Sequence, residues 1–234
     1  MLPPPRASCA FHPMPIQSEA DPRARPPRGR RPSHAPSGRE ALLVAARRSF
    51  ARKGFDGASL RDIAAQAGVD VALVARLFGS KDALWRAVID DLAAAGEHYR
   101  AQFDHLAAGG DARGGFCEFI VLFSRISLEI PEFPALLMQE TCTPGPRLES
   151  IERLLVEPFL AAAAPIVRAA IDQGVLRATD PALCLRMLLP AIALPLLGAA
   201  MSTDRAAAQG LADELARQAL QMLLVPAGAR QSPP

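Results

Sequence analysis

The sequence is poor in aromatic residues and in cysteine, and both shortages narrow the choice of protein class. Aromatic residues make up 5% of the 234 residues, with one tryptophan and one tyrosine. None of the four cysteines lies in a CxxC pair or another metal-ligand spacing: they are Cys9, Cys117, Cys142 and Cys184. This spacing argues against a zinc site. It favours reduced thiols in a cytosolic protein, with a redox-sensing pair as the weaker alternative.

Sequence motifs of catalysis are also missing. The chain has no phosphate-binding glycine loop, no GxSxG and no HExxH, so we predict no enzyme, no catalytic residue and no cofactor. His98 and His105 stand seven residues apart, two helical turns, which is too far to share a metal ion, and we predict no metal site. The N-terminal residues lack the apolar segment of a signal peptide.

What the chain does contain favours helices. Half of its residues are hydrophobic, with much alanine and leucine, and no strand pattern or internal repeat is visible. The net charge of +2 is unevenly distributed. Residues 1–38 and 39–85 carry +4 and +3, whereas residues 86–234 carry −5. A surface for nucleic acid, if present, is therefore expected in the N-terminal part of the chain.

Residues 59–78 predict two short helices joined by a tight turn. Ser59 is placed to cap the first helix, with Asp62 three residues later as the partner of a capping box. Gly68 can end that helix in the left-handed conformation, and Asp70 can cap the second. Its inward face would carry Val74 and Phe78. Two helices joined in this way form a helix-turn-helix, whose second helix enters the DNA major groove.

The segment that surrounds this pair resembles a known family. Residues 39–88 contain AARRSFARKGFDGAS, DIAAQAGV and LFGSKDAL in the order and spacing of the tetracycline-repressor (TetR) family of bacterial regulators. The resemblance implies an all-α protein with a three-helix DNA-binding domain over residues 39–86 and a helical regulatory and dimerisation domain over residues 87–226. The proline-rich and arginine-rich residues 1–38 and the final residues 227–234 are predicted to be disordered tails.

The resemblance also implies which residues contact DNA. We expect Val71, Ala72, Leu73 and Arg76 to face the major groove, and the lysine matching Lys81 commonly meets a phosphate in the family. The full set of expected DNA-binding residues is Ser59, Arg61, Val71, Ala72, Leu73, Arg76, Leu77 and Lys81. The chain departs from the family at Ala75, where a tyrosine is usual, and at Leu77, where an aromatic residue or histidine is frequent.

Further helices are expected after residue 80. They span about 81–106, 116–130, 132–143, 148–173, 181–201 and 208–225. In the family, the second domain holds a small ligand between its central helices. By that resemblance the expected pocket residues are Tyr99, Phe103, Phe119, Phe123, Met138 and Met187, with His98 or Glu140 as polar anchors. For each residue taken separately, an ordinary core position is the favoured interpretation.

We expect the last two predicted helices to form the interface of a homodimer. Residues 187–203 contain no charge, but they are short for a membrane span and two prolines interrupt them. A buried helix at a subunit interface is the better interpretation. The final helix should bury Leu211, Leu215, Ala219 and Met222 or Leu223. The last two helices should pair with their copies in a four-helix bundle.

The function that the resemblance implies is ligand-responsive regulation of transcription, most often repression, in the cytoplasm. The partners would be a second copy of the chain, a pseudo-palindromic DNA operator and a small apolar or amphipathic effector, with no membrane. The alternative is a helical small-molecule-binding module with weak or lost DNA binding, which Ala75 and Leu77 support. Arg23 to Arg31 form either a solvated tail or a basic arm that contacts DNA.

Overall fold

The computed structural model describes residues 37–200 and 204–226, and its regular elements are helical apart from one isolated β-bridge. The predicted all-α fold is thus confirmed. The helices are α1 (Gly38–Gly57), α2 (Leu60–Gln66), α3 (Val71–Phe78), α4 (Lys81–Ala108), α5 (Ala112–Glu129), α6 (Glu132–Thr141), α7 (Pro146–Ile151), the π-helical turn η1 (Glu152–Val156), α8 (Glu157–Asp172), α9 (Pro181–Ala200) and α10 (Arg205–Leu223). The predicted basic arm, nearly all of the N-terminal tail and the C-terminal tail lie outside the described residues.

Helix α1 begins at a capping box and is interrupted by a glycine. The Ser37 hydroxyl accepts from the Glu40 backbone N–H, and the Glu40 carboxylate accepts from the Ser37 backbone N–H. Gly54 leaves the helical conformation with φ of +69°, and the chain then makes one more helical turn. A β-carbon at Gly54 would lie 3.3 Å from the Gln139 side chain of α6, so glycine also allows α6 to approach closely.

The helix-turn-helix forms as predicted, although one of its caps does not. Gly68 takes a positive φ in the turn, and the Asp70 carboxylate accepts from the Ala72 backbone N–H at 2.7 Å. The expected capping box at the start of α2 is wrong. Ser59 holds the N-cap position without a side-chain cap bond, and Asp62 instead accepts from Lys53 Nζ at 3.0 Å. The nearby lysine offers Asp62 a charged partner, which is stronger than a backbone donor.

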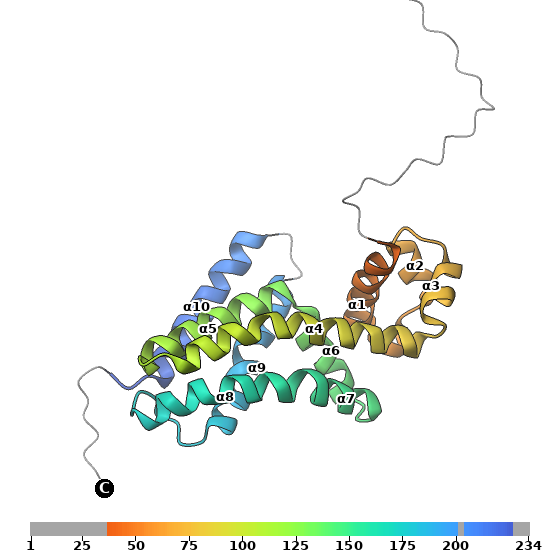
Figure 1. Ribbon diagram of the computed structural model, residues 1–234. Helices are drawn as coiled ribbons and strands as arrows, with labels where there is room; N and C mark the ends of the chain where they lie inside the picture. Colours follow the sequence, from red (N-terminus) through yellow and green to blue (C-terminus); the bar gives the residue numbers. More distant parts are fainter. Residues whose placement is uncertain (1–36, 201–203, 227–234) are drawn as a thin grey trace, which may run out of the picture. The chain divides into compact units, whose positions relative to one another are not determined.

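The DNA-binding part has its own hydrophobic core. Figure 1 shows α1, α2 and α3 grouped at the first turns of α4. Phe50, Ile63, Val74 and Trp85 are buried there, one from each of these four helices. Two later residues, Leu136 of α6 and Ile151 of α7, are buried in the same cluster. The first core is therefore completed by residues far along the chain.

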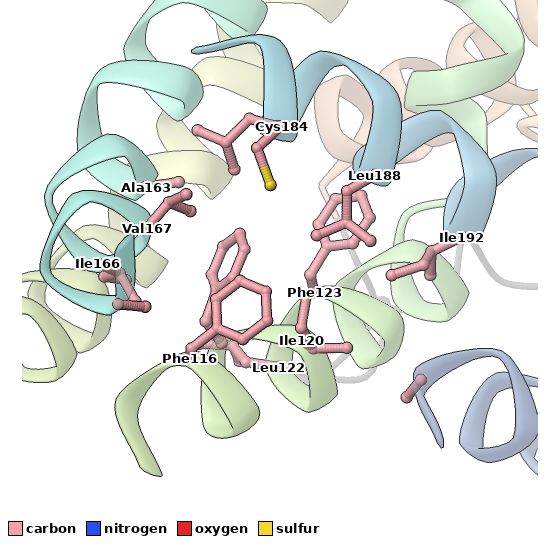
Figure 2. Close-up of a cluster of buried hydrophobic side chains, with 14 of the residues drawn as sticks. Phe116, Ile120, Leu122, Phe123, Ala163, Ile166, Val167, Cys184, Leu188 and Ile192 are labelled. Atoms are coloured by element: carbon pink, nitrogen blue, oxygen red, sulfur yellow. The ribbon is translucent and has the colours of Figure 1, made fainter. Parts of the chain in front are cut away.

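A second core lies among α4, α5, α8, α9 and α10. Figure 2 shows Phe116 and Phe123 of α5 facing Val167 of α8 and Leu188 of α9, with the Cys184 sulfur pointing into the cluster. Helix α5 begins at Ala112, before the predicted residue 116. Asp111 caps it by accepting from the Gly114 backbone N–H at 2.9 Å, which lets the glycine pair 114–115 join the helix.

The predicted interruption at residues 148–173 takes the form of a π-helical turn. The stretch runs through α7, η1 and α8 without leaving helical conformation. Pro158 lies in the first turn of α8, directly after η1, and Pro165 lies inside α8. Because proline has no backbone N–H, the turn before Pro158 loses a donor and can widen locally.

Helix α10 buries the expected face only in part. Leu215, Ala219 and Leu223 pack against the second core, as predicted. The prediction was wrong for Leu211 and Met222, which are exposed, while Ala208, Ala212 and Ala216 are buried instead. Small alanine side chains let α10 lie close to α5 and α9, while Leu211 and Met222 remain exposed. Val225 then donates from its backbone N–H to the Val175 carbonyl at 2.8 Å, tying the chain end beside the isolated bridge between Leu176 and Leu224.

Two helical stretches, Pro146–Asp172 and Pro181–Ala200, are long and apolar enough to cross a membrane by length and composition alone. Each of them contributes one face to the second core, for example through Val167 and Leu185. The remaining apolar residues of α9 include exposed side chains such as Met187.

The caps of α2 and α3 provide a matched stability test. Replacement Asp70→Ala removes the carboxylate that caps α3 and should lower the free energy of unfolding by about 1 kcal/mol. Replacement Ser59→Ala removes a hydroxyl that makes no cap bond and should change it by less than about 0.5 kcal/mol. Urea unfolding followed by circular dichroism measures both values, and equal losses in the two variants would contradict this account of the caps.

Candidate functional site

Helix α3 presents an exposed and largely apolar surface. Val71 and Leu77 are 46% and 41% exposed, and Ala72, Ala75 and Arg76 are exposed as well, whereas Val74 is buried in the core. The structure therefore places four predicted DNA-binding residues, Val71, Ala72, Arg76 and Leu77, on one accessible helix. Arg76 is the single cation of that helix.

Leu73 lies differently from its neighbours on α3. It is half-buried against the first core, and its Cδ2 atom would lie only 3.0 Å from a β-carbon added to Gly38. Its side chain thus packs on the start of α1. Arg39, the next residue of α1, has its guanidinium carbon 5.8 Å from the centre of the Phe78 ring of α3. The first turn of α1 therefore supports the recognition helix.

The remaining predicted DNA contacts flank α2 and begin α4. Ser59 and Arg61 are exposed at the start of α2. Lys81, at the first position of α4, is half-buried. Its Nζ donates to the carbonyls of Asp56 at 3.3 Å and Ala58 at 3.2 Å. The structure thus leaves Ser59 and Arg61 exposed, whereas Lys81 makes hydrogen bonds to carbonyls of the protein itself.

The structure also contains a large apolar cavity of about 990 Å³. Residues of α4, α5, α6, η1, α8 and α9 line it. Four of the six predicted pocket residues are among them: Tyr99, Phe103, Phe123 and Met138. Phe119 is fully buried in the second core and Met187 is 68% exposed on α9, and neither lines the cavity. A cavity of this size suits a drug-sized ligand.

Charged and polar groups border the cavity. Arg100 is paired with Glu97 at 3.0 Å, and Arg153 and Arg186 also line it. The hydroxyl of Tyr99 donates to Glu129 at 2.7 Å. Burial of the ring, followed by the hydrogen bond to Glu129 and its charge, raises the pKa of Tyr99 to about 12. The phenol is therefore a neutral donor at physiological pH.

The two proposed polar anchors lie elsewhere. His98 is exposed and does not line the cavity. Glu140 is buried and accepts from Arg147 Nε at 2.9 Å, on the side of α6 away from the cavity lining. Within residues 37–200 and 204–226, no three His, Cys, Asp or Glu residues gather as a metal site would require. Burial raises the pKa of the Cys184 thiol, which makes it a poor nucleophile.

Helix α6 contacts both the cavity and the DNA-binding helices. Leu137, Met138 and Thr141 line the cavity. On its other face Leu136 is buried in the first core, and the Glu132 carboxylate forms an ion pair with Arg47 of α1 at 3.5 Å. One short helix therefore contacts both the candidate ligand cavity and the candidate DNA-binding surface.

Sequence reasoning missed several cavity residues. Phe133 of α6, Phe159 of α8 and Leu189 of α9 line the cavity, and the Phe159 ring meets Phe103 edge-on at 5.2 Å. The Glu140–Arg147 pair was also missed. These residues carry no local signal, because their positions depend on how distant helices pack, and apolar periodicity alone does not separate cavity walls from core.

An exposed helix α3 in a helix-turn-helix, packed on a further helical domain, is the arrangement of DNA-binding transcription regulators. Comparison with known families agrees: residues 42–88 match the model of bacterial regulatory proteins of the tetR family. Residues 42–88 are therefore a DNA-binding domain of the TetR family, whose members are transcription regulators rather than enzymes.

Curated relatives match a short stretch of the chain. The HTH-type transcriptional repressor Rv3405c of Mycobacterium tuberculosis is 49% identical over 61 residues, which are 24% of this chain and 32% of the relative. The HTH-type transcriptional regulator Mb3439c of Mycobacterium bovis matches to the same extent. The match thus covers about a third of the relatives' length.

Solved structures share the fold over most of the chain. HlyIIR, a hemolysin II transcriptional regulator, superposes with a TM-score of 0.61 at 20% identity, covering 80% of this chain and 97% of that one. PfmR, a TetR-family regulator from Thermus thermophilus, gives 0.59 at 23% identity, over 77% and 97% of the two chains. A protein from Saccharomonospora viridis, in complex with choline, gives 0.58 at 19% identity, over 80% and 97%.

The single tyrosine gives the cavity border a clean spectroscopic signal. Tyr99 should ionise near pH 12, as followed by tyrosinate absorbance, and Glu129→Gln should move its pKa toward the ordinary value of 10.0. Since the folded-state pKa is raised, the stabilisation from the neutral phenol is complete below pH 10 and is lost as the pH rises toward 12. Ionisation near pH 10 in protein that circular dichroism shows to be folded would contradict the contact.

Proposed function

We propose that this protein is a ligand-responsive repressor that binds a pseudo-palindromic operator as a homodimer. The observation that carries the proposal is the position of α6, with Leu137 and Met138 on the cavity and Leu136 in the core of the DNA-binding helices. We propose repression rather than activation because the curated M. tuberculosis relative is described as a repressor. This function implies that the protein lies in the cytoplasm and associates with the nucleoid when it binds DNA.

The proposed effector is a small apolar or amphipathic molecule. The cavity wall is mainly aliphatic and aromatic, and arginines and glutamates stand among the residues that line it. Ring positions such as Phe103 and Phe123 would contact an apolar body, while Arg153 or Arg186 would meet a polar end. The S. viridis neighbour was solved with choline, which supports small-molecule binding in this fold without fixing the ligand of this chain.

The proposed mechanism is a shift between two conformations. An effector that binds better to the conformation with mis-spaced recognition helices lowers operator affinity by its differential binding energy and no more. In the structure, α6 contacts both sites, as do α4 and η1. A ligand that displaces Leu137 and Met138 would therefore also move Leu136 and Glu132, which touch the DNA-binding helices.

The proposed dimer interface lies on α9 and α10. Leu183, Met187 and Leu194 are exposed on α9, and Leu211 and Met222 are exposed on α10. A four-helix bundle formed with the partner's copies would bury these side chains. Two recognition helices would then read half-sites about one DNA turn apart, roughly 34–36 Å or slightly more.

The alternative, a ligand-binding module with weak or lost DNA binding, rests on Ala75 and Leu77. Both are exposed on α3, where neither can donate a hydrogen bond to a phosphate. The apolar surface instead fits contacts with thymine methyl groups. Binding of the purified chain to the DNA upstream of its own gene separates the two functions, since the alternative predicts no sequence-specific complex.

Arg76 tests the DNA-binding proposal most simply. Replacement Arg76→Ala should weaken operator binding by about 1–3 kcal/mol if the guanidinium reads a base. Arg168 is equally charged and exposed on α8, so Arg168→Ala serves as the matched control and should leave affinity unchanged. Fluorescence anisotropy with a labelled operator measures both variants, and wild-type affinity in Arg76→Ala would refute the assigned role.

Met187 tests the proposed dimer. Replacement Met187→Glu would bury an unpaired charge in the interface and should raise the dimer dissociation constant at least about tenfold. Val121 of α5 is 57% exposed and lies outside the proposed interface, so Val121→Glu is the control. Sedimentation equilibrium across micromolar concentrations measures both. A monomeric wild-type protein, or equal effects of the two substitutions, would count against the interface.

A further inference from the structure

The ammonium group of Lys81 is already engaged inside the protein. Its Nζ donates to two carbonyls, those of Asp56 and Ala58, at 3.3 and 3.2 Å. It also lies 4.5 Å from the centre of the Phe55 ring, within cation–π range. A lysine ammonium has three N–H donors, and two carbonyls with one aromatic ring are enough to occupy all three. A bound phosphate would have to break these contacts.

A second cation meets the same phenylalanine. The guanidinium carbon of Arg147, one residue into α7, lies 4.3 Å from the centre of the Phe55 ring. Arg147 is held there by Glu140 of α6, whose side chain is only 6% exposed, through a bond of 2.9 Å. Phe55, Lys81, Arg147 and Glu140 form one connected unit, the Phe55 clamp, which joins α4 and the α1–α2 turn to the helices of the regulatory domain.

The clamp determines where the α1–α2 turn lies. Asp56 and Ala58 supply the carbonyls that Lys81 holds, and Ala58 is buried. The next residue is Ser59, and Arg61 follows in the first turn of α2. Fixing these carbonyls therefore fixes the start of α2 relative to α4, and with it the DNA-facing side chains of both helices.

We propose that Lys81 is a positioning residue and not a phosphate ligand, and that Arg147 completes the same clamp from the regulatory domain. The proposal rests on the proposed function, because it describes how the operator-binding surface is held. It also gives α6 a specific mechanical role. Glu140 stands on α6 beside Thr141, which lines the cavity, so a ligand that moves α6 moves the anchor of Arg147.

The salt dependence of operator binding separates positioning from phosphate contact. Loss of one phosphate contact lowers the slope of log affinity against log salt by roughly 0.9. Lys81→Gln should instead weaken binding about 5- to 30-fold with an unchanged slope, the size expected for losing a cation–π and hydrogen-bonded contact. A slope reduced by about one in this variant would overturn the proposal.

Variants of Arg147 provide a second and independent test. Arg147→Gln should weaken operator binding over the same range with an unchanged slope, and Arg147→Lys, which keeps a cation over Phe55, should recover most of the loss. The Lys81→Gln/Arg147→Gln double variant should bind no more than about twofold more weakly than the weaker single variant, because both substitutions break one unit. Wild-type affinity in Arg147→Gln, or losses that multiply in the double variant, would overturn it.

Two controls separate loss of the Phe55 clamp from loss of charge and from misfolding. Arg168→Gln on α8 removes an equivalent charge away from the clamp and should change neither affinity nor slope. The DNA-binding-competent fraction of each variant is fixed by stoichiometric titration, so misfolded protein does not enter the affinity. If the wild-type chain itself binds no operator, the proposed function fails. If the wild type binds and the variants depart from the pattern above, the clamp alone fails.

Discussion

Helix α6 has to satisfy two environments at once. Leu136 completes the core of the DNA-binding helices, while Leu137 and Met138, its neighbours in sequence, form part of the cavity wall. Close packing leaves little freedom for such a helix, because a shift that suits one face disturbs the other. Gly54 has no β-carbon, and one placed there would lie 3.3 Å from the Gln139 side chain of α6, which shows how closely the two regions approach. This shared helix makes communication between a ligand and DNA physically possible.

The contacts around α6 also distribute the cationic side chains of the DNA-binding domain. Arg47 pairs with Glu132, and Lys81 is held by carbonyls and by Phe55. Fewer positive charges are therefore available to phosphates than the sequence count suggests. Together with the apolar surface of α3, this arrangement favours recognition through shape and methyl contacts, supported by a small number of exposed arginines.

The sequence predicted features that depend on local chemistry. Gly68, Asp70 and Ser80 lie within thirteen residues and direct the turn and the two helix starts, and each takes its expected position. Features that depend on how distant helices pack were harder to predict from the sequence. The fully buried residues of α10 are alanines, and Phe119 is buried in the core. Glu140 accepts a hydrogen bond from Arg147, which lies beyond a proline-containing turn. Apolar periodicity identifies an inward face only when large side chains do the packing, and no local pattern marks a cavity wall.

The most direct single measurement is a crystal structure of the full chain bound to its operator. We predict two copies joined through α9 and α10, with α3 in successive major grooves. We also predict that Lys81 Nζ remains within hydrogen-bonding distance of the Asp56 and Ala58 carbonyls, with Arg147 still over Phe55. A complex in which Lys81 has left these carbonyls for a DNA phosphate, with the Phe55–Arg147 contact broken, would contradict the clamp and the role of α6 that depends on it.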